Sequence, residues 1–296
     1  MRKFLALTGS LLIFASVGFS QKFALKLGGG WGQASGGDFA KYIQGQSDYA
    51  HDAFTTNDRF VFPHLGMNFG GEFIFYFRPN MGLGLGFGYF RLAKDSEIAY
   101  DFGDVSATEQ LKPNFMIIPL TLSFHYLWPL SSKLSLDLEA GISSFLVKLD
   151  WDYTTNFHLA LPNDPSQVYE GVDQFIFQSG YRFGSGLQAG VSLEYRLFPR
   201  ISLVIGGLGR ISLLSASGFK GNWTEQGSGD LWNFLDSGSG TYVWYYAWKF
   251  NDKTYSQVVF QDEEPAAGAT VSNVRRAKFG LTGFTATIGV KIGLGR

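Results

Sequence analysis

The strictest pattern in the sequence is a two-residue alternation of large apolar side chains with glycine and polar side chains. It is plainest over residues 181–214, where two such runs flank the turn Phe198-Pro199-Arg200. Successive side chains of a β-strand point to opposite faces, so each run predicts a strand with one apolar and one polar face. The polar face carries too much glycine and charge for a solvent surface, which indicates an apolar exterior and a polar interior, as in a transmembrane β-barrel.

The same alternation recurs in eight segments of the chain, and each reaches the roughly 9–11 residues that a tilted transmembrane strand requires. These segments cover residues 22–31, 67–77, 81–89, 114–128, 134–146, 181–197, 201–214 and 284–294. A content of 38 glycines and 17% aromatic residues suits a narrow interior and ring-lined membrane interfaces. The sequence therefore predicts an all-β chain, an antiparallel up-and-down barrel of eight strands that forms a single domain over residues 21–296.

The connections between these segments alternate in length. Short turns lie at Pro79, Pro129 and Pro199, and the long connections cover about residues 33–63, 93–112, 150–180 and 217–276. Outer-membrane barrels have short periplasmic turns and long extracellular loops. The pattern predicts a bacterial outer-membrane protein with both termini in the periplasm.

The strand count has an alternative in the longest connection. Residues 241–250 and 254–260 flank Asn251-Asp252-Lys253, which is a hairpin signal. A barrel of ten strands would result if this hairpin crossed the membrane. Its first arm carries aromatic side chains on both faces, which favours an extracellular hairpin and a barrel of eight strands.

The N-terminus predicts export. Two basic residues, an apolar core over residues 4–19 and a small-x-small site over residues 18–20 indicate a signal peptide over residues 1–20. No later segment approaches the roughly 18 apolar residues of a spanning helix. The sequence has no cysteine, which excludes disulfides and thiolate metal sites, and a net charge of −1 gives no reason to expect nucleic acid as a partner.

Three of the predicted strands carry a resemblance to a known family. Residues 119–126, 138–141 and 191–197, the last with its proline turn, look like the small outer-membrane β-barrel proteins of the OmpX and OmpA type. The resemblance covers residues 21–296 as an architecture. It implies an eight-stranded antiparallel barrel surrounded by outer-membrane lipid and inserted by the barrel-assembly machinery. Such chains commonly end in an aromatic residue, and this one ends in Leu294-Gly295-Arg296.

Charges at the predicted inward positions are segregated by strand. Lysines lie on the first and last strands, which face the acidic middle strands across a closed ring of eight. Buried charges persist when they are paired, so we expect an ion-pair network that plugs the lumen. Its expected members are Lys26, Glu72, Asp137, Glu139, Glu194, Arg210 and Lys291. A selectivity filter in a narrow channel or small-solute transporter is the alternative, although eight strands leave little open bore.

The sequence offers few candidates for chemistry. Ser123 and His125 share the inward face and could suggest a lipid hydrolase, but His125 lies near the predicted periplasmic turn, at the wrong end for an outer-leaflet substrate. No metal-ligand spacing is recognisable, so we expect no catalytic residues, no metal site and no cofactor.

An aromatic group in the longest connection and a basic group at the start of the last strand could recognise partners. An aromatic group predicts either a recognition surface or a cap over the barrel mouth: Trp223, Trp232, Trp244, Tyr245, Tyr246 and Trp248. Basic residues at the predicted outer end of the last strand could bind lipopolysaccharide phosphates or be solvated at the rim: Arg275, Arg276 and Lys278. The leading hypothesis is a non-enzymatic barrel that acts through its extracellular loops, in surface interaction or envelope integrity, with a partner that the sequence does not identify.

Overall fold

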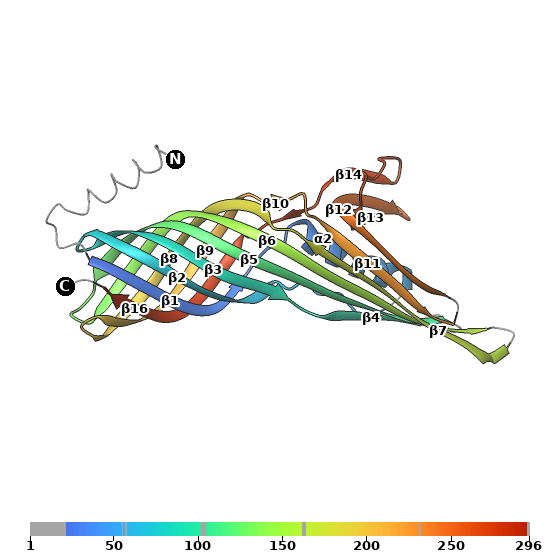
Figure 1. Cartoon of the computed structure of the whole chain (residues 1–296), viewed down its shortest axis with the longest axis horizontal. Coiled ribbons are helices and arrows are strands. Elements are labelled where there is room, and N and C mark those ends of the chain that lie inside the picture. Colours follow the sequence, from blue (N-terminus) through green and yellow to red (C-terminus); the bar gives the residue numbers. More distant parts are fainter. Residues whose placement is uncertain are drawn as a thin grey trace.

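The computed structural model describes residues 22–54, 56, 58–101, 105–161, 164–230 and 232–294 (Figure 1). The predicted signal peptide lies outside these described residues. Within them the chain forms sixteen strands and one helix, and fourteen of the strands belong to a single sheet. All strand pairs in this sheet are antiparallel, so the predicted antiparallel all-β fold is confirmed.

Eight strands of the sheet close on themselves and form a ring. In ring order they are β1 (Lys22–Gln33), β2 (Leu65–Arg78), β3 (Met81–Ala93), β5 (Val105–Pro129), β6 (Leu134–Leu161), β8 (Arg182–Phe198), β9 (Ile201–Leu214) and β16 (Gly283–Gly293). The first and last strands pair in register, with Lys26 opposite Lys291, and β5 pairs with β6 along its whole length. These are the eight strands that the alternation predicts.

One end of the ring carries all the short connections. The turns at residues 79–80, 130–133 and 199–200 lie there, and β1 begins and β16 ends at the same end (Figure 1). We call it the short-turn end and the opposite one the long-loop end. The alternation of connection lengths that the sequence shows therefore corresponds to two structurally different ends of the ring.

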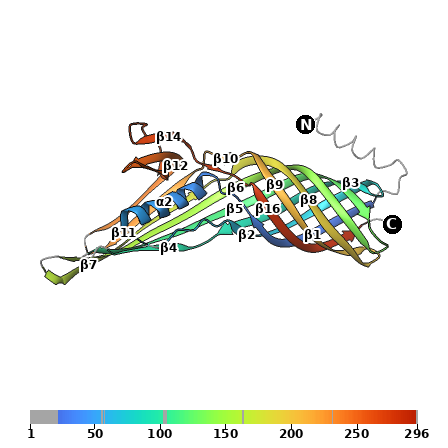
Figure 2. The ribbon, with the colours of Figure 1, turned by 180° about the vertical axis from the view of Figure 1, so that it is seen from behind.

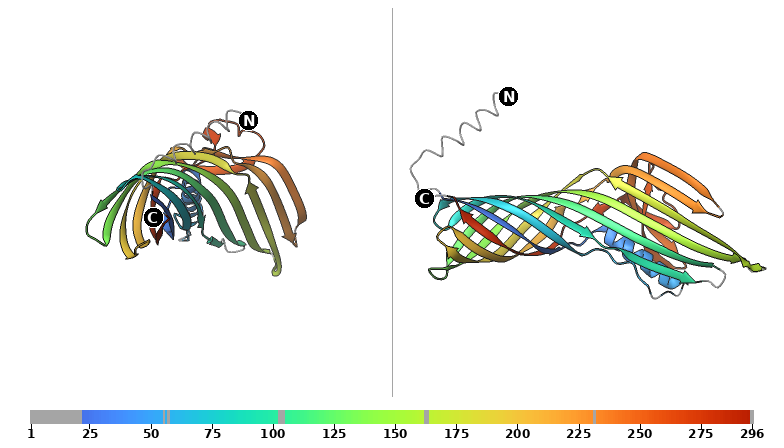
Figure 3. Two further views of the ribbon diagram at one scale, coloured as in Figure 1. Left: turned by 60° about the vertical axis from the view of Figure 1, so that its left-hand side comes forward. Right: turned by 60° about the horizontal axis from the view of Figure 1, so that its bottom comes forward.

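The sheet continues beyond the ring at its long-loop end, where β5 and β6 extend and further strands join them. We call this part the extension. It contains β4 (Ser96–Asp101), β7 (Asp164–Ser179), β11 (Lys220–Gly229), β12 (Asn233–Phe250), β13 (Lys253–Gln261) and β14 (Val271–Arg276). It forms a curved, open sheet (Figure 3). The prediction of loops over residues 93–112 and 217–276 was therefore largely wrong, because these strands lack the apolar-polar alternation of the ring.

The hairpin of β12 and β13 belongs to the extension. β12 pairs with β11, β13 and β14, and none of its pairings is with a ring strand. The ring consequently has eight strands, not ten. A short separate pairing joins β10 (Ala216–Ser217) to β15 (Lys278–Phe279).

The predicted loop over residues 33–63 contains the helix α2, Asp38–Phe54, so the prediction of an irregular segment was wrong. Figure 2 shows α2 against the concave side of the extension. Phe39, Ile43 and Ala50 are buried on one face of the helix, at spacings close to whole helical turns. The other positions of α2 mix Gly, Gln and Asp with alanine and aromatic residues, and this mixture gives no clear helical signal in the sequence. Among the described residues, no helix has both the length and the apolar character to cross a membrane.

Close packing and side-chain hydrogen bonds hold α2 on β13. Gly45 lies so close that a Cβ atom there would be 2.8 Å from the backbone nitrogen and oxygen of Ser256. Near the end of the helix, Asp52 accepts hydrogen bonds from Lys253 at 2.6 Å and from Tyr255 at 2.8 Å. These two bonds lower the pKa of the Asp52 carboxyl. The contact is therefore retained at neutral pH and is lost as the pH falls into the range where the carboxyl protonates.

The close approach of α2 to β13 gives a test of the helix position. Alanine has a helix propensity about 1 kcal/mol better than glycine, so Gly45→Ala would stabilise an undocked helix. In this structure the added methyl group meets the Ser256 backbone, and we expect Gly45→Ala to weaken docking and speed hydrogen exchange in α2. Gly268→Ala is the control, because nothing lies within 4 Å of a Cβ there. Slower exchange in the Gly45→Ala helix would contradict the packing.

Candidate functional site

The outside of the ring is an apolar belt. Large side chains at the outward positions of all eight strands are exposed, with Leu85 at 65% and Leu213 at 67%. The belt includes Leu27, Phe69, Phe73, Leu85, Phe87, Leu120, Leu122, Ile142, Leu187, Val191, Ile205, Ile211, Leu213 and Ile288. Soluble monomers rarely expose contiguous apolar patches larger than a few hundred Å², so an apolar surface that encircles the molecule needs a non-aqueous neighbour.

The inside of the ring contains a charged layer, which we call the ionic layer. Its members are Lys26, Glu72, His125, Asp137, Glu139, Glu194 and Lys291, together with Ser123 and Ser192. All project inward from ring strands, because side chains of one parity face the interior. The charged residues of the predicted network are therefore brought together, apart from Arg210.

One set of contacts in the ionic layer crosses the lumen. Lys26 on β1 lies 3.3 Å from the Glu139 carboxylate and 3.9 Å from that of Asp137, both on the opposite strand β6. Its ammonium also donates a hydrogen bond to Ser192 Oγ at 3.2 Å. This arrangement matches the predicted placement of a base on the first strand opposite acids on the middle strands.

Lys291 has a different partner from the one expected. Its ammonium lies 2.6 and 2.7 Å from the two oxygens of Glu194, and both side chains are buried. Only β9 separates β16 from β8 in the ring, so Glu194 is within reach without crossing the lumen. The expectation that Lys291 faces Asp137 and Glu139 was therefore wrong.

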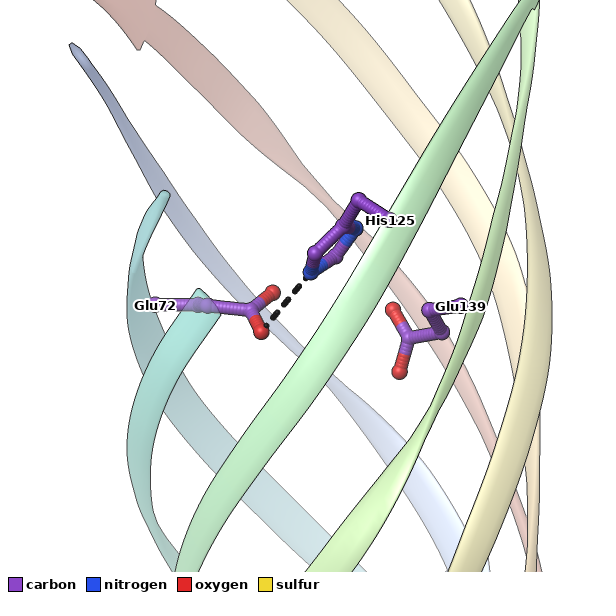
Figure 4. Close-up of side chains that lie close together, drawn as sticks. All are labelled: Glu72, His125 and Glu139. Atoms are coloured by element: carbon purple, nitrogen blue, oxygen red, sulfur yellow. Dashed lines mark hydrogen bonds and ion pairs between the residues drawn. The ribbon is translucent and has the colours of Figure 1, made fainter. Parts of the chain in front are cut away.

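His125 connects the acids of the ionic layer. The imidazole is fully buried, with Nδ1 3.1 Å from both oxygens of Asp137 and Nε2 3.0 Å from Glu72 Oε1. Ser123 donates a hydrogen bond to Glu72, and its Oγ is 3.0 Å from His125 Nε2. Figure 4 shows Glu72, His125 and Glu139 converging from three strands. The alternation in the sequence shows that His125 faces inward. It does not show that the imidazole joins the carboxylates of Asp137 and Glu72.

Arg210 does not join an ion pair. It donates a hydrogen bond to Thr285 at 2.7 Å, its Nε is buried without a partner, and among the described residues no carboxylate lies within 4.0 Å. It faces Gly283 at the start of β16, whereas Lys291 lies near the end of that strand. The prediction that Arg210 belongs to the ion-pair network was wrong. Alternation along a strand shows that a side chain points inward, but not how far along the ring axis it lies.

A cavity of about 150 Å³ adjoins the ionic layer. The polar residues that line it are Lys26, Asn68, Glu72, Thr121, Glu139, Gln188, Ser192 and Arg210. Glycines line it as well, among them Gly28, Gly70, Gly86, Gly88 and Gly289. Buried polar atoms of Asn68, Gln188 and Arg210 have no protein partner, and the volume suits on the order of ten water molecules.

Beyond the cavity, toward the long-loop end, the interior is apolar. We call this part the aromatic layer, and it consists of Phe39, Phe62, Phe90, Phe115, Phe145 and Phe279. Phe115 contacts three of the others, with ring centroids 5.4 Å from Phe39, 5.6 Å from Phe62 and 4.7 Å from Phe279. The sequence contains a signal for this layer, because the inward positions of three successive ring strands carry phenylalanine here: Phe90, Phe115 and Phe145.

The candidate lipopolysaccharide contacts lie in the extension and its junction with the ring. Arg275 and Arg276 belong to β14 and Lys278 to β15, so none of them begins the last ring strand, contrary to the expectation. Arg275 forms an ion pair with Asp38 at 2.6 Å, and Arg276 stacks on Trp244 with its guanidinium carbon 3.6 Å from the ring centroid. The guanidinium of Arg275 is therefore already paired, whereas Nη1 of Arg276 is buried without a hydrogen-bond partner.

The candidate aromatic recognition residues are dispersed. Trp244 and Tyr245 are buried, Tyr246 is half-buried and Trp232 is exposed. Trp223 stacks on Phe175 of β7, whereas Trp248 packs on Tyr49 of α2. The structure therefore spreads the six residues over several parts of the extension, where they do not form a single surface.

The contacts of Ser123, His125 and Asp137 have the order of a hydroxyl–imidazole–carboxylate relay, which can activate a serine for nucleophilic attack. Ser123 is only 2% exposed, however, and its hydroxyl also binds Glu72. Ion pairing and proton sharing between strands are the chemistry that this geometry supports. The absence of enzymatic activity stays a prediction.

Comparisons with known proteins identify no family. No protein-family model matches the chain, and no curated protein matches it. Among solved structures it is similar to a major outer membrane protein from Thermus thermophilus, at 14% identity, over 93% of this chain and 100% of that chain, with a TM-score of 0.37. A likeness this remote carries no inference about function.

The pair of Lys291 and Glu194 provides a test of the ionic layer. Removing one partner of a buried ion pair costs about 3–5 kcal/mol, so we expect Lys291→Met to lower the free energy of unfolding by that amount. Adding Glu194→Gln should recover a substantial part of the loss. The measurement is urea unfolding followed by gel mobility, with exposed Lys133→Met as the control. Equal effects of Lys291→Met and Lys133→Met would contradict the pair.

Proposed function

We propose that this chain is a transmembrane β-barrel of the bacterial outer membrane whose lumen is closed. The observation that carries the proposal is the apolar belt around a closed ring with a charged interior. In lipid, every backbone polar group needs an internal partner, and a closed ring of strands meets that requirement because it has no edge. The same ring in water would expose its apolar residues and bury its charges.

The contents of the ring support a closed lumen. The ionic layer joins opposite strands through side chains, and the aromatic layer fills the interior toward the long-loop end. Between them lies a cavity of about 150 Å³. An eight-stranded ring has an interior just wide enough for side chains, so these two layers oppose the passage of solutes.

We therefore propose that the extension, and not the lumen, carries out the function of the protein. The short-turn end, with both chain termini, faces the periplasm, and the extension with α2 projects from the cell. The role is non-enzymatic, in surface interaction or envelope integrity, and the surroundings are outer-membrane lipid and lipopolysaccharide. Residues 1–20 direct export, and the barrel-assembly machinery inserts the chain.

Topology can be tested directly because the chain contains no cysteine. Single cysteines at three exposed positions would report on three environments: Ser239 in the extension, Leu85 in the belt and Ser132 in a short turn. In intact cells, a membrane-impermeant maleimide should label Ser239→Cys alone, and Ser132→Cys should react once the outer membrane is opened. Leu85→Cys should react only after denaturation. Labelling of Leu85→Cys in intact cells, or equal labelling of the other two, would contradict the proposal.

Conductance tests the closed lumen separately. In planar bilayers we expect no reproducible single-channel current from the wild-type protein, because both layers obstruct the ring. Replacing Phe90, Phe115 and Phe145 together with alanine, which opens the aromatic layer alone, should still give little current, since the ionic layer remains. A robust wild-type conductance would support a channel instead.

A further inference from the structure

We propose that the ionic layer contains a binding site for a divalent transition-metal ion of the zinc class, with Glu72, His125 and Glu139 as ligands. One ligand atom from each of the three side chains lies within 4.8 Å of those from the other two (Figure 4). They come from β2, β5 and β6, three different strands of the ring. An ion bound here would join these strands from inside the lumen, whatever surrounds the ring.

The spacing of the ligand atoms suits one ion. Zinc binds histidine nitrogen and carboxylate oxygen at about 2.0–2.2 Å, so two ligands on one tetrahedral ion lie roughly 3.3–3.6 Å apart. His125 Nε2 and Glu72 Oε1 are 3.0 Å apart, so an ion between them requires the two atoms to separate by only a few tenths of an ångström. The ligand atom of Glu139 lies within 4.8 Å of both, so it is close enough to complete the set.

The surrounding groups orient the ligands as in known metal sites. A ligating histidine almost always donates its second ring N–H to a carboxylate, a carbonyl or water, which directs the other nitrogen to the metal. His125 Nδ1 lies 3.1 Å from Asp137, and this leaves Nε2 directed at Glu72. The Glu72 carboxylate is in turn held by the Ser123 hydroxyl.

The local charge favours a cation. Glu72, Asp137 and Glu139 supply three negative charges, and Lys26 is the ammonium among them. With a neutral imidazole these four groups sum to −2, and Arg210, which lines the adjoining cavity, reduces the sum to −1, so the net charge still favours a cation. The neighbouring pair of Lys291 and Glu194 is neutral by itself and does not alter this sum.

The adjoining cavity provides room for the remaining coordination positions. Glu72 and Glu139 both line it, so water molecules there could complete the shell of an ion held between them. Gln188 also lines the cavity, is 6% exposed, and has a side-chain carbonyl oxygen without a hydrogen-bond partner. That oxygen is suited to accept a hydrogen bond from a metal-bound water molecule.

The donor set selects the kind of ion. One imidazole nitrogen and two carboxylate oxygens suit zinc and its first-row neighbours. Calcium prefers about six to eight oxygen ligands, and magnesium retains a largely aqueous octahedral shell. We therefore expect binding of Zn²⁺ or Co²⁺, and no competition from Ca²⁺ or Mg²⁺ at equal concentration.

Lys26 acts as a competitor for the site. Its ammonium lies 3.3 Å from Glu139 and neutralises part of the charge that a metal would bind. We therefore expect Lys26→Met to bind zinc more tightly than the wild-type protein, by roughly tenfold or more, because removing a nearby like charge favours the ion. Weaker binding by Lys26→Met would contradict this charge balance.

The experiment uses the full chain, refolded in detergent with Zn²⁺ present so that burial of the site cannot prevent loading. After desalting, elemental analysis should find one zinc per chain, and Co²⁺ in its place should give visible d–d absorption. His125→Gln and Glu139→Gln should each lose at least tenfold in affinity, and Asp137→Asn about 10–100-fold. Folding of each variant is checked by heat-dependent gel mobility.

Lys291→Met combined with Glu194→Gln is the matched control, because it removes a neutral ion pair from the same layer outside the ligand set and leaves no buried unpaired charge. We expect it to retain one zinc per chain. A folded wild-type protein without zinc would overturn the proposal, as would equal zinc loss in this double variant and in Glu139→Gln. If the substituted chains fail to fold, the Co²⁺ spectrum of the wild-type protein decides, because a spectrum without d–d bands would also exclude the site.

Discussion

Lateral backbone pairing around a closed ring is the constraint on which the rest of the structure depends. Each of the eight ring strands has a partner on both sides, so the sheet has no edge within the ring. Side-chain alternation then assigns every residue of these strands to the inside or the outside. Leu85 and Phe87 are exposed on the belt, whereas His125 and Asp137 are fully buried in the lumen.

Closure of the ring also determines how its interior is stabilised. An eight-stranded ring cannot leave its inward charges in bulk water, so they must compensate one another. Lys26 does this across the lumen with Glu139, and Lys291 does it beside Glu194. The aromatic layer then separates these charges from the long-loop end, and only a small cavity lies between the two layers.

The ring could be predicted from the sequence because its signal is local. Period-two alternation, as over residues 81–89, assigns strand and face together. The partner of Lys291 could not be predicted, because alternation places several acids in the same inward layer and does not show which of them lies nearest to the lysine. The helix α2 was missed because only Phe39, Ile43 and Ala50 mark its buried side. The strands of the extension were not predicted for a related reason: they show little apolar-polar alternation, and β12 is aromatic on both faces.

The central claim is that the outward face of the ring contacts lipid and the inward face does not. Spin labels placed one at a time along residues 81–89 of β3, with the protein in lipid vesicles, test it most directly. Accessibility to oxygen, which dissolves in lipid, should alternate with a period of two and be highest at Leu83, Leu85 and Phe87. High accessibility at the intervening glycines instead, or no alternation with uniform access to a water-soluble reagent, would contradict the account.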